Sequence, residues 1–189
     1  MPSEDPSRPR TVLVVCFGNL CRSPMAEGLF RARLPGGEWR VLSAGTHAVG
    51  GDPPTHGSCD AISRLTGIDI SGQRSAPLTP SMLESSDFVF TMSRQQALEA
   101  AALAPAAAAK IRLLGAFAPA AGTASTPADP GGRRADPLEI ADPMGGDQAL
   151  YDSCCEHLIA SVDGAAGWLL AGADNAAAPP SVAAWRERS

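Results

Sequence analysis

A cysteine and an arginine close together near the start of the chain carry the clearest chemical potential. Cys16 ends an apolar, β-type run, and Arg22 follows six positions later at the start of a helical pattern. This order places a thiol and a guanidinium at the two ends of a tight loop between a buried strand and a helix N-terminus. Backbone N–H groups converge there, and the helix dipole favours negative charge. The pattern predicts a loop that holds a phosphate-like oxyanion against a nucleophilic thiolate.

The residues of this loop suit that task. The planar fork of Arg22 can grip two phosphoryl oxygens at once. Gly and Asn tolerate positive φ, so they suit a loop that turns its amide groups inward. The hydroxyl of the serine after Arg22 can point at the sulfur and stabilise its thiolate. The candidate phosphate-binding residues are therefore Phe17, Gly18, Asn19, Leu20, Cys21 and Ser23.

Hydrophobic periodicity and turn residues predict strands that alternate with helices. The expected strands are 11–16, 39–44, 87–92 and 111–114, and the expected helices are 23–34, 55–66, Ser93 to about Leu103, and 147–171. Such alternation argues for an open parallel α/β sheet with helices on both faces. Ligands of these sheets bind beyond the carboxyl ends of the strands, where the strand order switches. The loop after the first strand is in the right place.

Length and composition are those of one globular domain. The chain has 189 residues, which predicts a flexible lead over 1–10, a domain over 11–171 and a flexible tail over 172–189. Residues 116–137 are rich in Ala, Pro and Gly, and we expect a long loop there, either a surface insertion or a mobile flap. The formal net charge of −5 indicates no nucleic-acid partner.

The sequence shows neither a targeting signal nor the cysteine spacing of a disulfide-rich domain. The first residues lack a signal-peptide pattern, and no apolar run has the length of a membrane span. The five cysteines lack the spacing of a small disulfide-rich domain. We therefore expect the protein to lie in the cytoplasm, a reducing compartment in which the cysteine of a thiolate enzyme would stay reduced.

The segment from Val15 to Glu27, VCFGNLCRSPMAE, resembles the phosphate loop of the bacterial low-molecular-weight protein tyrosine phosphatases. Weaker matches follow in the family's order: Ser43–Thr46, Asp87–Met92 and Asp142-Pro143. The resemblance covers roughly residues 11–115 and 138–171. It implies a three-layer, flavodoxin-like α/β sandwich with a four-stranded parallel sheet and the phosphate loop after strand 1.

The resemblance also implies the activity and the roles of the site residues. Cys16 would be the nucleophile, Arg22 would bind the phosphoryl group, and Asp142 would be the general acid and later the base. The implied reaction is metal-independent hydrolysis of phosphotyrosine in a protein substrate, through a cysteinyl-phosphate and without a cofactor. Cys21 matches a second cysteine of many members, and a reversible disulfide with Cys16 would protect the nucleophile from oxidation.

Some details leave alternatives open. Asp-Pro pairs usually mark turns, and Asp136 is the second candidate for the acid. Met144 and the loop at Val49 stand where many relatives place aromatic residues at the cleft rim, which leaves Phe17 as the expected aromatic residue of the floor. We therefore expect weaker or broader recognition of aryl phosphates.

Two other functions share the loop or the fold. Thioredoxin-coupled arsenate reductases need further cysteines near the end of the third strand, but no cysteine lies between Cys59 and Cys154. A weakly active or non-catalytic phosphate-binding protein is the other alternative, since fold does not settle function. Zinc binding by Cys16 and Cys21 is disfavoured by their spacing and by the scattered histidines.

Overall fold

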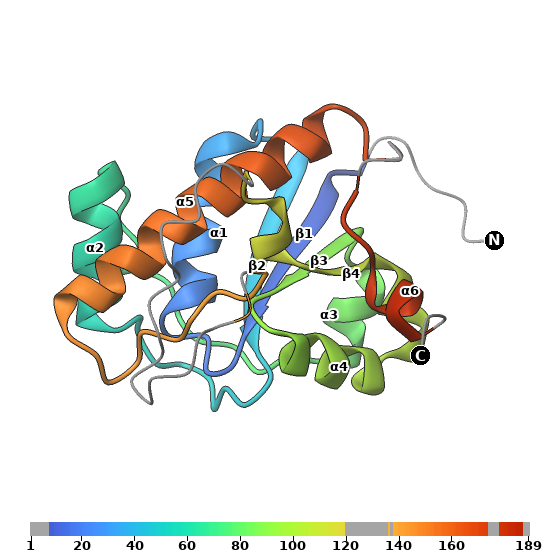
Figure 1. Ribbon diagram of the computed structural model, residues 1–189, viewed down its shortest axis with the longest axis horizontal. Helices are drawn as coiled ribbons and strands as arrows, with labels where there is room; N and C mark the ends of the chain where they lie inside the picture. The colour runs from blue at the N-terminus through green and yellow to red at the C-terminus, as the bar shows by residue number, and fades with distance from the viewer. Residues whose placement is uncertain (1–7, 120–135, 137, 174–177, 187–189) are drawn as a thin grey trace.

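A parallel sheet in the order β2-β1-β3-β4 forms the centre of the computed structural model, which describes residues 8–119, 136, 138–173 and 178–186. Its strands are β1 (Arg10–Cys16), β2 (Trp39–Gly45), β3 (Phe88–Thr91) and β4 (Ile111–Leu113). From Val12 to Cys16, β1 is a continuous run of buried apolar residues, as expected for a parallel strand covered on both faces. Because β2 and β3 lie on opposite sides of β1, the strand order switches at the carboxyl end of β1 (Figure 1).

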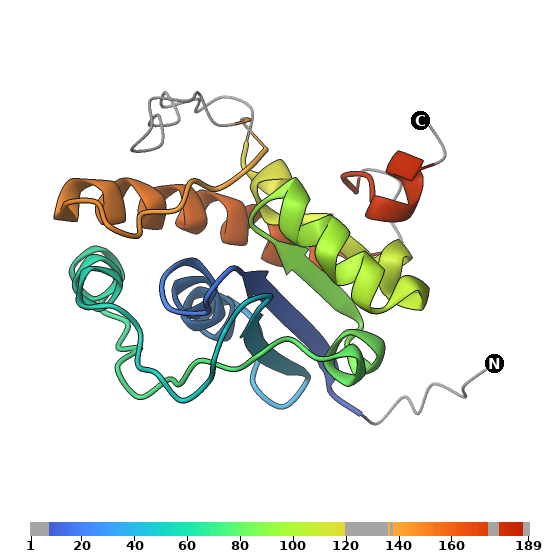
Figure 2. The same cartoon turned by 90° about the horizontal axis from the view of Figure 1, so that it is seen from below.

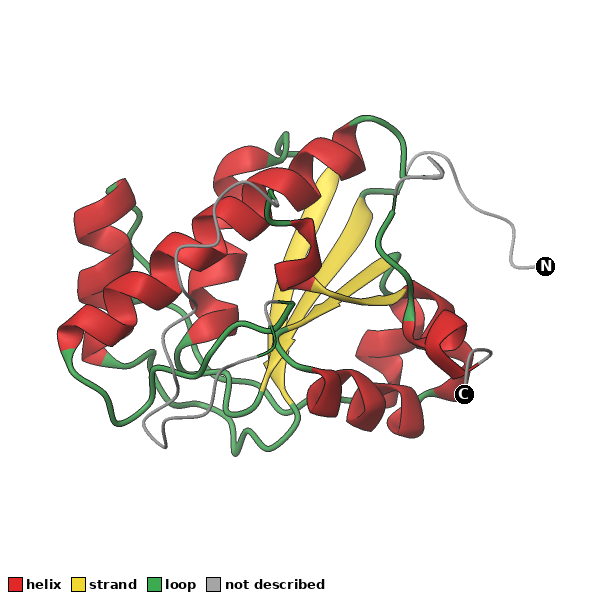
Figure 3. Cartoon of the chain, in the orientation of Figure 1, coloured by secondary structure: helices red, strands yellow, loops and turns green. Residues whose placement is uncertain are grey.

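Helices cover both faces of the sheet, which confirms the predicted α/β architecture (Figures 2 and 3). One face carries α1 (Arg22–Arg33), α2 (His56–Thr66) and α5 (Gln148–Leu170). The other carries α3 (Pro80–Ser85), α4 (Arg94–Leu103) and α6 (Val182–Arg186). The short helices η1 (Pro105–Lys110) and η2 (Leu114–Phe117) flank β4.

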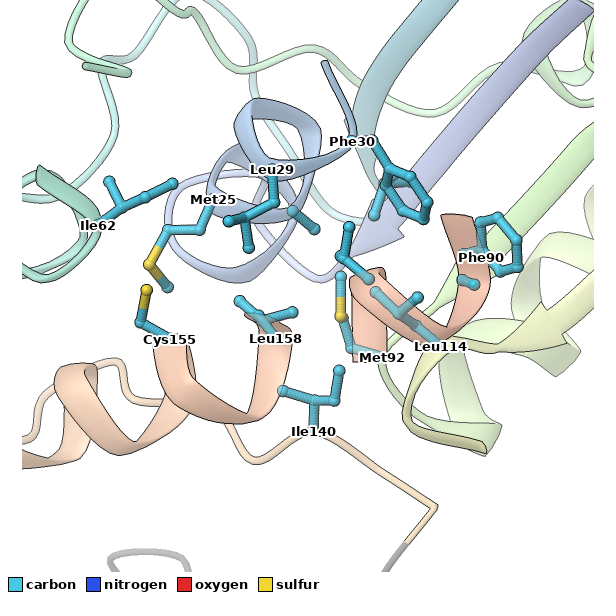
Figure 4. Close-up of a cluster of buried hydrophobic side chains, with 14 of the residues drawn as sticks. Met25, Leu29, Phe30, Ile62, Phe90, Met92, Leu114, Ile140, Cys155 and Leu158 are labelled. Carbon is cyan, nitrogen blue, oxygen red and sulfur yellow. The ribbon is translucent and has the colours of Figure 1, made fainter. Parts of the chain in front are cut away.

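The alternation of side chains along β1 divides the core into two clusters. Val12 and Val14 face α1 and α5, where Leu29, Phe30 and Leu158 are fully buried (Figure 4). The alternate residues of the strand, Leu13 and Val15, point to the opposite face and pack against α3, α4 and α6. The sheet is thus held from both sides, and the loop at the end of β1 begins from a fixed strand.

The structure has short helices that the sequence-based prediction lacks, namely α3, α6, η1 and η2. α3 and α6 were not predicted, since helices of five or six residues show too little periodicity to detect. The flexible tail expected over 172–189 is wrong for α6, because Val182 is fully buried in the second cluster. At the other end, Arg10 already belongs to β1 rather than to a lead segment. Most of the expected loop over 116–137 lies outside the described residues.

No helix in the described ranges has both the length and the apolar character needed to cross a membrane.

Candidate active site

The phosphate loop, residues 16–22, lies between the carboxyl end of β1 and the first turn of α1 (Figure 1). It rests against the end of β2, where Thr46 N donates to the Cys16 carbonyl at 3.0 Å and His47 N donates to the Phe17 carbonyl at 2.9 Å. A β-carbon on Gly45 would lie 2.5 Å from the Phe17 carbonyl oxygen. Only glycine therefore lets β2 approach the loop this closely.

Asn19 holds the shape of the loop from inside. Its φ of 55° is left-handed, and the residue is 2% exposed. The side-chain nitrogen donates to the hydroxyls of Ser23 and Ser43 at 2.8 and 2.9 Å, while Oδ1 accepts from Ala76 N at 2.8 Å. One amide thus ties together α1, β2 and the segment before α3.

A directed chain of hydrogen bonds runs from α1 to the sulfur of Cys16. The Ser43 hydroxyl donates to Glu27 Oε2 at 2.5 Å, so its oxygen is left to accept from Asn19. Asn19 also donates to Ser23 Oγ, whose proton has two acceptors within reach, the Cys16 sulfur at 2.9 Å and the Ala44 carbonyl at 3.5 Å, and the shorter contact favours the sulfur. Burial raises the pKa of Glu27, whereas Ser43 and nearby Arg31 favour its ionised form.

The Cys16 sulfur lies in a small cage of donors. Asn19 N donates to it at 3.2 Å, and the Ser23 hydroxyl contacts it from α1. Within the described part of the chain no side chain caps α1, so the N–H groups of its first turn are available to an anion. Both features favour negative charge at the carboxyl end of β1.

Arg22 lies buried between the phosphate loop and the segment before α5. Its Nη1 donates to the Ile140 carbonyl at 3.1 Å, and its Nη2 pairs with the carboxylate of Asp142. Its Nε is buried and has no hydrogen-bond partner among the described residues. An unsatisfied buried donor is costly, and an oxyanion in the loop would satisfy it.

The structure places the two candidate acids in different surroundings. Asp142 is 43% exposed in its side chain, pairs with Arg22 and accepts from Met144 N at 3.2 Å. Asp136 instead accepts from Leu138 N and from Arg94, and these contacts hold its pKa below the usual range. Of the two, Asp142 is the one brought to Arg22, and its role as the acid stays a prediction.

The remaining cysteines have environments unlike that of Cys16. Burial raises the pKa of Cys21, whose sulfur lies 3.4 Å from Thr55 Oγ1 and 4.0 Å from the Tyr151 hydroxyl. Burial also raises the pKa of Cys154, and that of Cys155 to about 11. All are free thiols. The protective disulfide between Cys16 and Cys21 stays a prediction.

The rim of the loop carries an aromatic pair that the sequence analysis missed. Phe17 is 48% exposed and stacks on His47, with ring centroids 4.4 Å apart and planes 13° from parallel. His47 Nδ1 lies 2.9 Å from Thr46 Oγ1, which orients the imidazole. Its position directly after the Ser43–Thr46 match was the available signal. The two expected rim residues, Val49 and Met144, are exposed.

Among the described residues, no group of three or more His, Cys, Asp or Glu side chains could hold a metal ion.

A buried thiol and a buried guanidinium stand at the two ends of the loop after the first strand of a parallel sheet, an arrangement that suits cysteine-dependent phosphoryl transfer. The model of the family described as low molecular weight phosphotyrosine protein phosphatase matches residues 11–170, and the chain belongs to this family.

The relatives that the chain resembles include a tyrosine phosphatase and an arsenate reductase. The chain is 40% identical to the probable low molecular weight protein-tyrosine-phosphatase EpsP of Ralstonia solanacearum over 106 residues, which are 56% of this chain and 71% of EpsP. It is 42% identical to an arsenate reductase of Bacillus licheniformis over 83 residues, 44% of this chain and 56% of the reductase.

Two solved structures show the fold over most of the chain. The tyrosine phosphatase Wzb from Escherichia coli K30, solved with sulphate, has a TM-score of 0.71 at 25% identity, covering 86% of this chain and 99% of Wzb. The YwlE arginine phosphatase from Geobacillus stearothermophilus has a TM-score of 0.70 at 27% identity, covering 86% of this chain and 94% of YwlE.

Proposed function

We propose that this chain hydrolyses phosphotyrosine in protein substrates through a cysteinyl-phosphate on Cys16, without a metal or a cofactor. The observation that carries the proposal is the buried guanidinium of Arg22. It joins the thiol loop to the carboxylate of Asp142 and keeps one buried N–H without a partner among the described residues. A bound phosphoryl group would satisfy that donor and lie between the nucleophile and the acid.

In the first step the Cys16 thiolate attacks phosphorus, and the bond between phosphorus and the tyrosine oxygen breaks. The loop amides and Arg22 hold the equatorial oxygens, where charge is spread in the transition state. Once the phosphoryl group takes the donors of Arg22, the protonated carboxyl of Asp142 gives its proton to the leaving phenolate. Such a proton transfer contributes about 10²–10⁴-fold.

In the second step a water molecule attacks the cysteinyl-phosphate. The carboxylate of Asp142 takes the proton of the water, and the bond between sulfur and phosphorus breaks to release inorganic phosphate. The departing thiolate of Cys16 is received by the Ser23 hydroxyl and by Asn19 N, which lie 2.9 and 3.2 Å from the sulfur. The same two donors therefore serve the nucleophile and the leaving group.

The aromatic pair at the rim supports an aryl substrate. Phe17 follows the nucleophile directly, so the ring of a phosphotyrosine bound at Cys16 would lie beside it. His47 stacks on Phe17 and limits its motion, which favours an ordered surface for that ring. The proposed recognition surface thus comes from the loop and from the end of β2 rather than from Met144 or Val49.

The experiment measures hydrolysis of aryl phosphate in the presence of a chelator. We expect activity in the wild type and its loss in Cys16→Ser and Arg22→Ala. Asp142→Ala should reduce turnover of poor leaving groups, with Asp136→Ala as its matched comparison. Full activity of Cys16→Ser would contradict the mechanism, and a loss in Asp136→Ala alone would move the acid to that residue.

Three parallel assays decide between related functions. Turnover of arsenate with thioredoxin, without turnover of aryl phosphate, would favour a reductase. Hydrolysis of phosphoarginine in preference to aryl phosphate would favour the substrate named for YwlE. Binding of phosphate without turnover of any of these compounds would favour the non-catalytic alternative. We also propose a reducing, cytoplasmic location, on the grounds that all five cysteines are free thiols.

A further inference from the structure

Arg94, the first residue of α4, contacts the acid segment, which we define as residues 138–142. Its Nε donates to Asp136 Oδ2 at 2.9 Å, just before this segment. Its backbone N donates to Glu139 Oε1 at 2.7 Å, within the segment. Glu139 N in turn donates to the Asp136 carbonyl at 2.8 Å. Arg94 thus holds a closed turn at the start of the acid segment.

The middle of the acid segment is held by the sheet and the core. Ile140 N donates to the carbonyl of Met92, at the end of β3, at 2.9 Å. The Ile140 side chain is 1% exposed and belongs to the first core cluster with Leu114 and Leu158 (Figure 4). A β-carbon on Gly115 would lie 2.5 Å from the Leu138 carbonyl, so η2 and this backbone are in close contact.

These contacts end at Ile140, two residues before Asp142, whose carboxyl group is the proposed acid. The Ile140 carbonyl accepts from Arg22 Nη1 at 3.1 Å, and the Asp142 carboxylate meets Nη2 of the same guanidinium. The position of Asp142 relative to Arg22 therefore depends on how firmly Ile140 is held. The contacts of Arg94 lie immediately upstream of Ile140, on the solvent side, where the segment is otherwise exposed.

We propose that Arg94 is a positioning residue for the general acid, acting through Asp136 and Glu139. This inference rests on the proposed function, since it concerns the residue that protonates the leaving group. Arg94 does not touch the phosphoryl group. Arg94 raises the fraction of molecules in which Asp142 is correctly placed. Its loss should therefore slow only those substrates whose leaving group needs a proton.

The test compares two substrates that differ in their need for an acid. The phenolate of phenyl phosphate is a poor leaving group, whereas the phenolate of 2,4-dinitrophenyl phosphate leaves without being protonated. The value of kcat/KM includes the step in which the phenol departs. We expect Arg94→Gln and Asp136→Asn each to lower kcat/KM for phenyl phosphate about twofold to fivefold, the range of a partly exposed ion pair. The value for 2,4-dinitrophenyl phosphate should stay that of the wild type.

A matched control is the surface pair of Arg33 and Asp163. It has the same geometry, with Nε 2.8 Å from Oδ1, and it joins α1 to α5. Arg33→Gln should leave both substrates unchanged. Arg94 also lies over the Trp185 ring, 5.2 Å from its centroid, so Arg94→Gln removes this contact as well as the one to Asp136. The double variant Arg94→Gln/Asp136→Asn should therefore be no worse than Arg94→Gln alone.

Two results would overturn the inference. One is an equal loss of kcat/KM on both substrates, which would indicate a general structural role. The other is a kcat/KM for phenyl phosphate that stays that of the wild type in Arg94→Gln and Asp136→Asn. If the wild type hydrolyses neither ester, the proposed function fails, and hydrogen exchange at the Ile140 amide still tests the positioning. Exchange there should be faster in Arg94→Gln than in Arg33→Gln, and equal rates would contradict the positioning role.

Discussion

The phosphate loop and the acid segment face each other across Arg22, but they are held in different ways. The phosphate loop is buried, and its serine and asparagine side chains contact each other, β2 and α1. The acid segment has one buried side chain, Ile140, and its carboxylates lie towards solvent. The difference teaches that the anion site is preorganised before substrate arrives. Asp142, the proposed proton donor, by contrast lies on a segment whose position depends on a few contacts.

The first way to break this comparison is Arg22→Lys. The ammonium group keeps the charge but loses the planar fork and the contacts to both regions. We expect kcat/KM to fall about 10³-fold, and equally for phenyl and 2,4-dinitrophenyl phosphate, since every substrate needs the phosphoryl group held. A loss confined to phenyl phosphate would mean that Arg22 serves the acid segment rather than the phosphate loop.

Asp142→Asn should affect one region without the other. The amide cannot give a proton, so kcat/KM for phenyl phosphate should fall about 10²-fold. The value for 2,4-dinitrophenyl phosphate should change little, and the Kd for inorganic phosphate should stay that of the wild type. A change in phosphate binding as large as the change in turnover would contradict the separation of the two regions.

Gly45→Ala tests how much the phosphate loop depends on its support. The added β-carbon would meet the Phe17 carbonyl and Asn19 N at 2.5 and 2.8 Å. We expect the free energy of unfolding to fall by about 1–3 kcal/mol, and kcat/KM to fall about tenfold for both substrates. Thermal unfolding and kinetics measure these effects. Gly72→Ala is the matched control, because a β-carbon there has no neighbour within 4 Å among the described residues.

His47→Ala should produce a smaller effect, on the aryl ring alone. Loss of the stacked partner should raise KM for aryl phosphates about threefold with little change in kcat, the size of one aromatic contact. An alkyl phosphate should be unaffected, and His47→Phe should restore most of the aryl preference. Equal changes for aryl and alkyl phosphates would argue against the aromatic pair as the recognition surface.

The smallest expected effect concerns the stability that Asp136 contributes. Its folded pKa lies below the ordinary value of 3.8, first through the Leu138 N–H and then through Arg94. This stabilisation is fully present above about pH 4 and is lost as the pH falls through the lowered pKa. Asp136→Asn should therefore be less stable than the wild type at pH 7, by less than about 1 kcal/mol. Chemical denaturation should show that this gap closes in acid.

Much of the fold follows from local patterns. The strands and the longer helices lie within a residue or two of their predicted positions, because buried apolar runs and the cap at Ser93 are local signals. Cys16 and Arg22 were placed together for the same reason, since only the loop separates them.

Contacts between segments that are distant in the sequence could not be predicted from such local patterns. The pairing of Arg94 with Asp136 joins residues 42 positions apart, and the stacking of Phe17 with His47 depends on how β2 ends beside the loop. The helix α6 is too short to show periodicity and is held by burial of Val182. These features arise from packing, and the position of His47 directly after the Ser43–Thr46 match was the one local signal for any of them.

The stacking of His47 on Phe17 has a consequence for how this enzyme could diverge. Phe17 is covalently next to the nucleophile, so most substitutions there would disturb the chemistry together with the choice of substrate. His47 touches the substrate surface only through the ring that it supports, from a neighbouring strand end. In the proposed recognition surface, a single substitution at His47 would therefore alter which esters are preferred while the reaction itself is left intact.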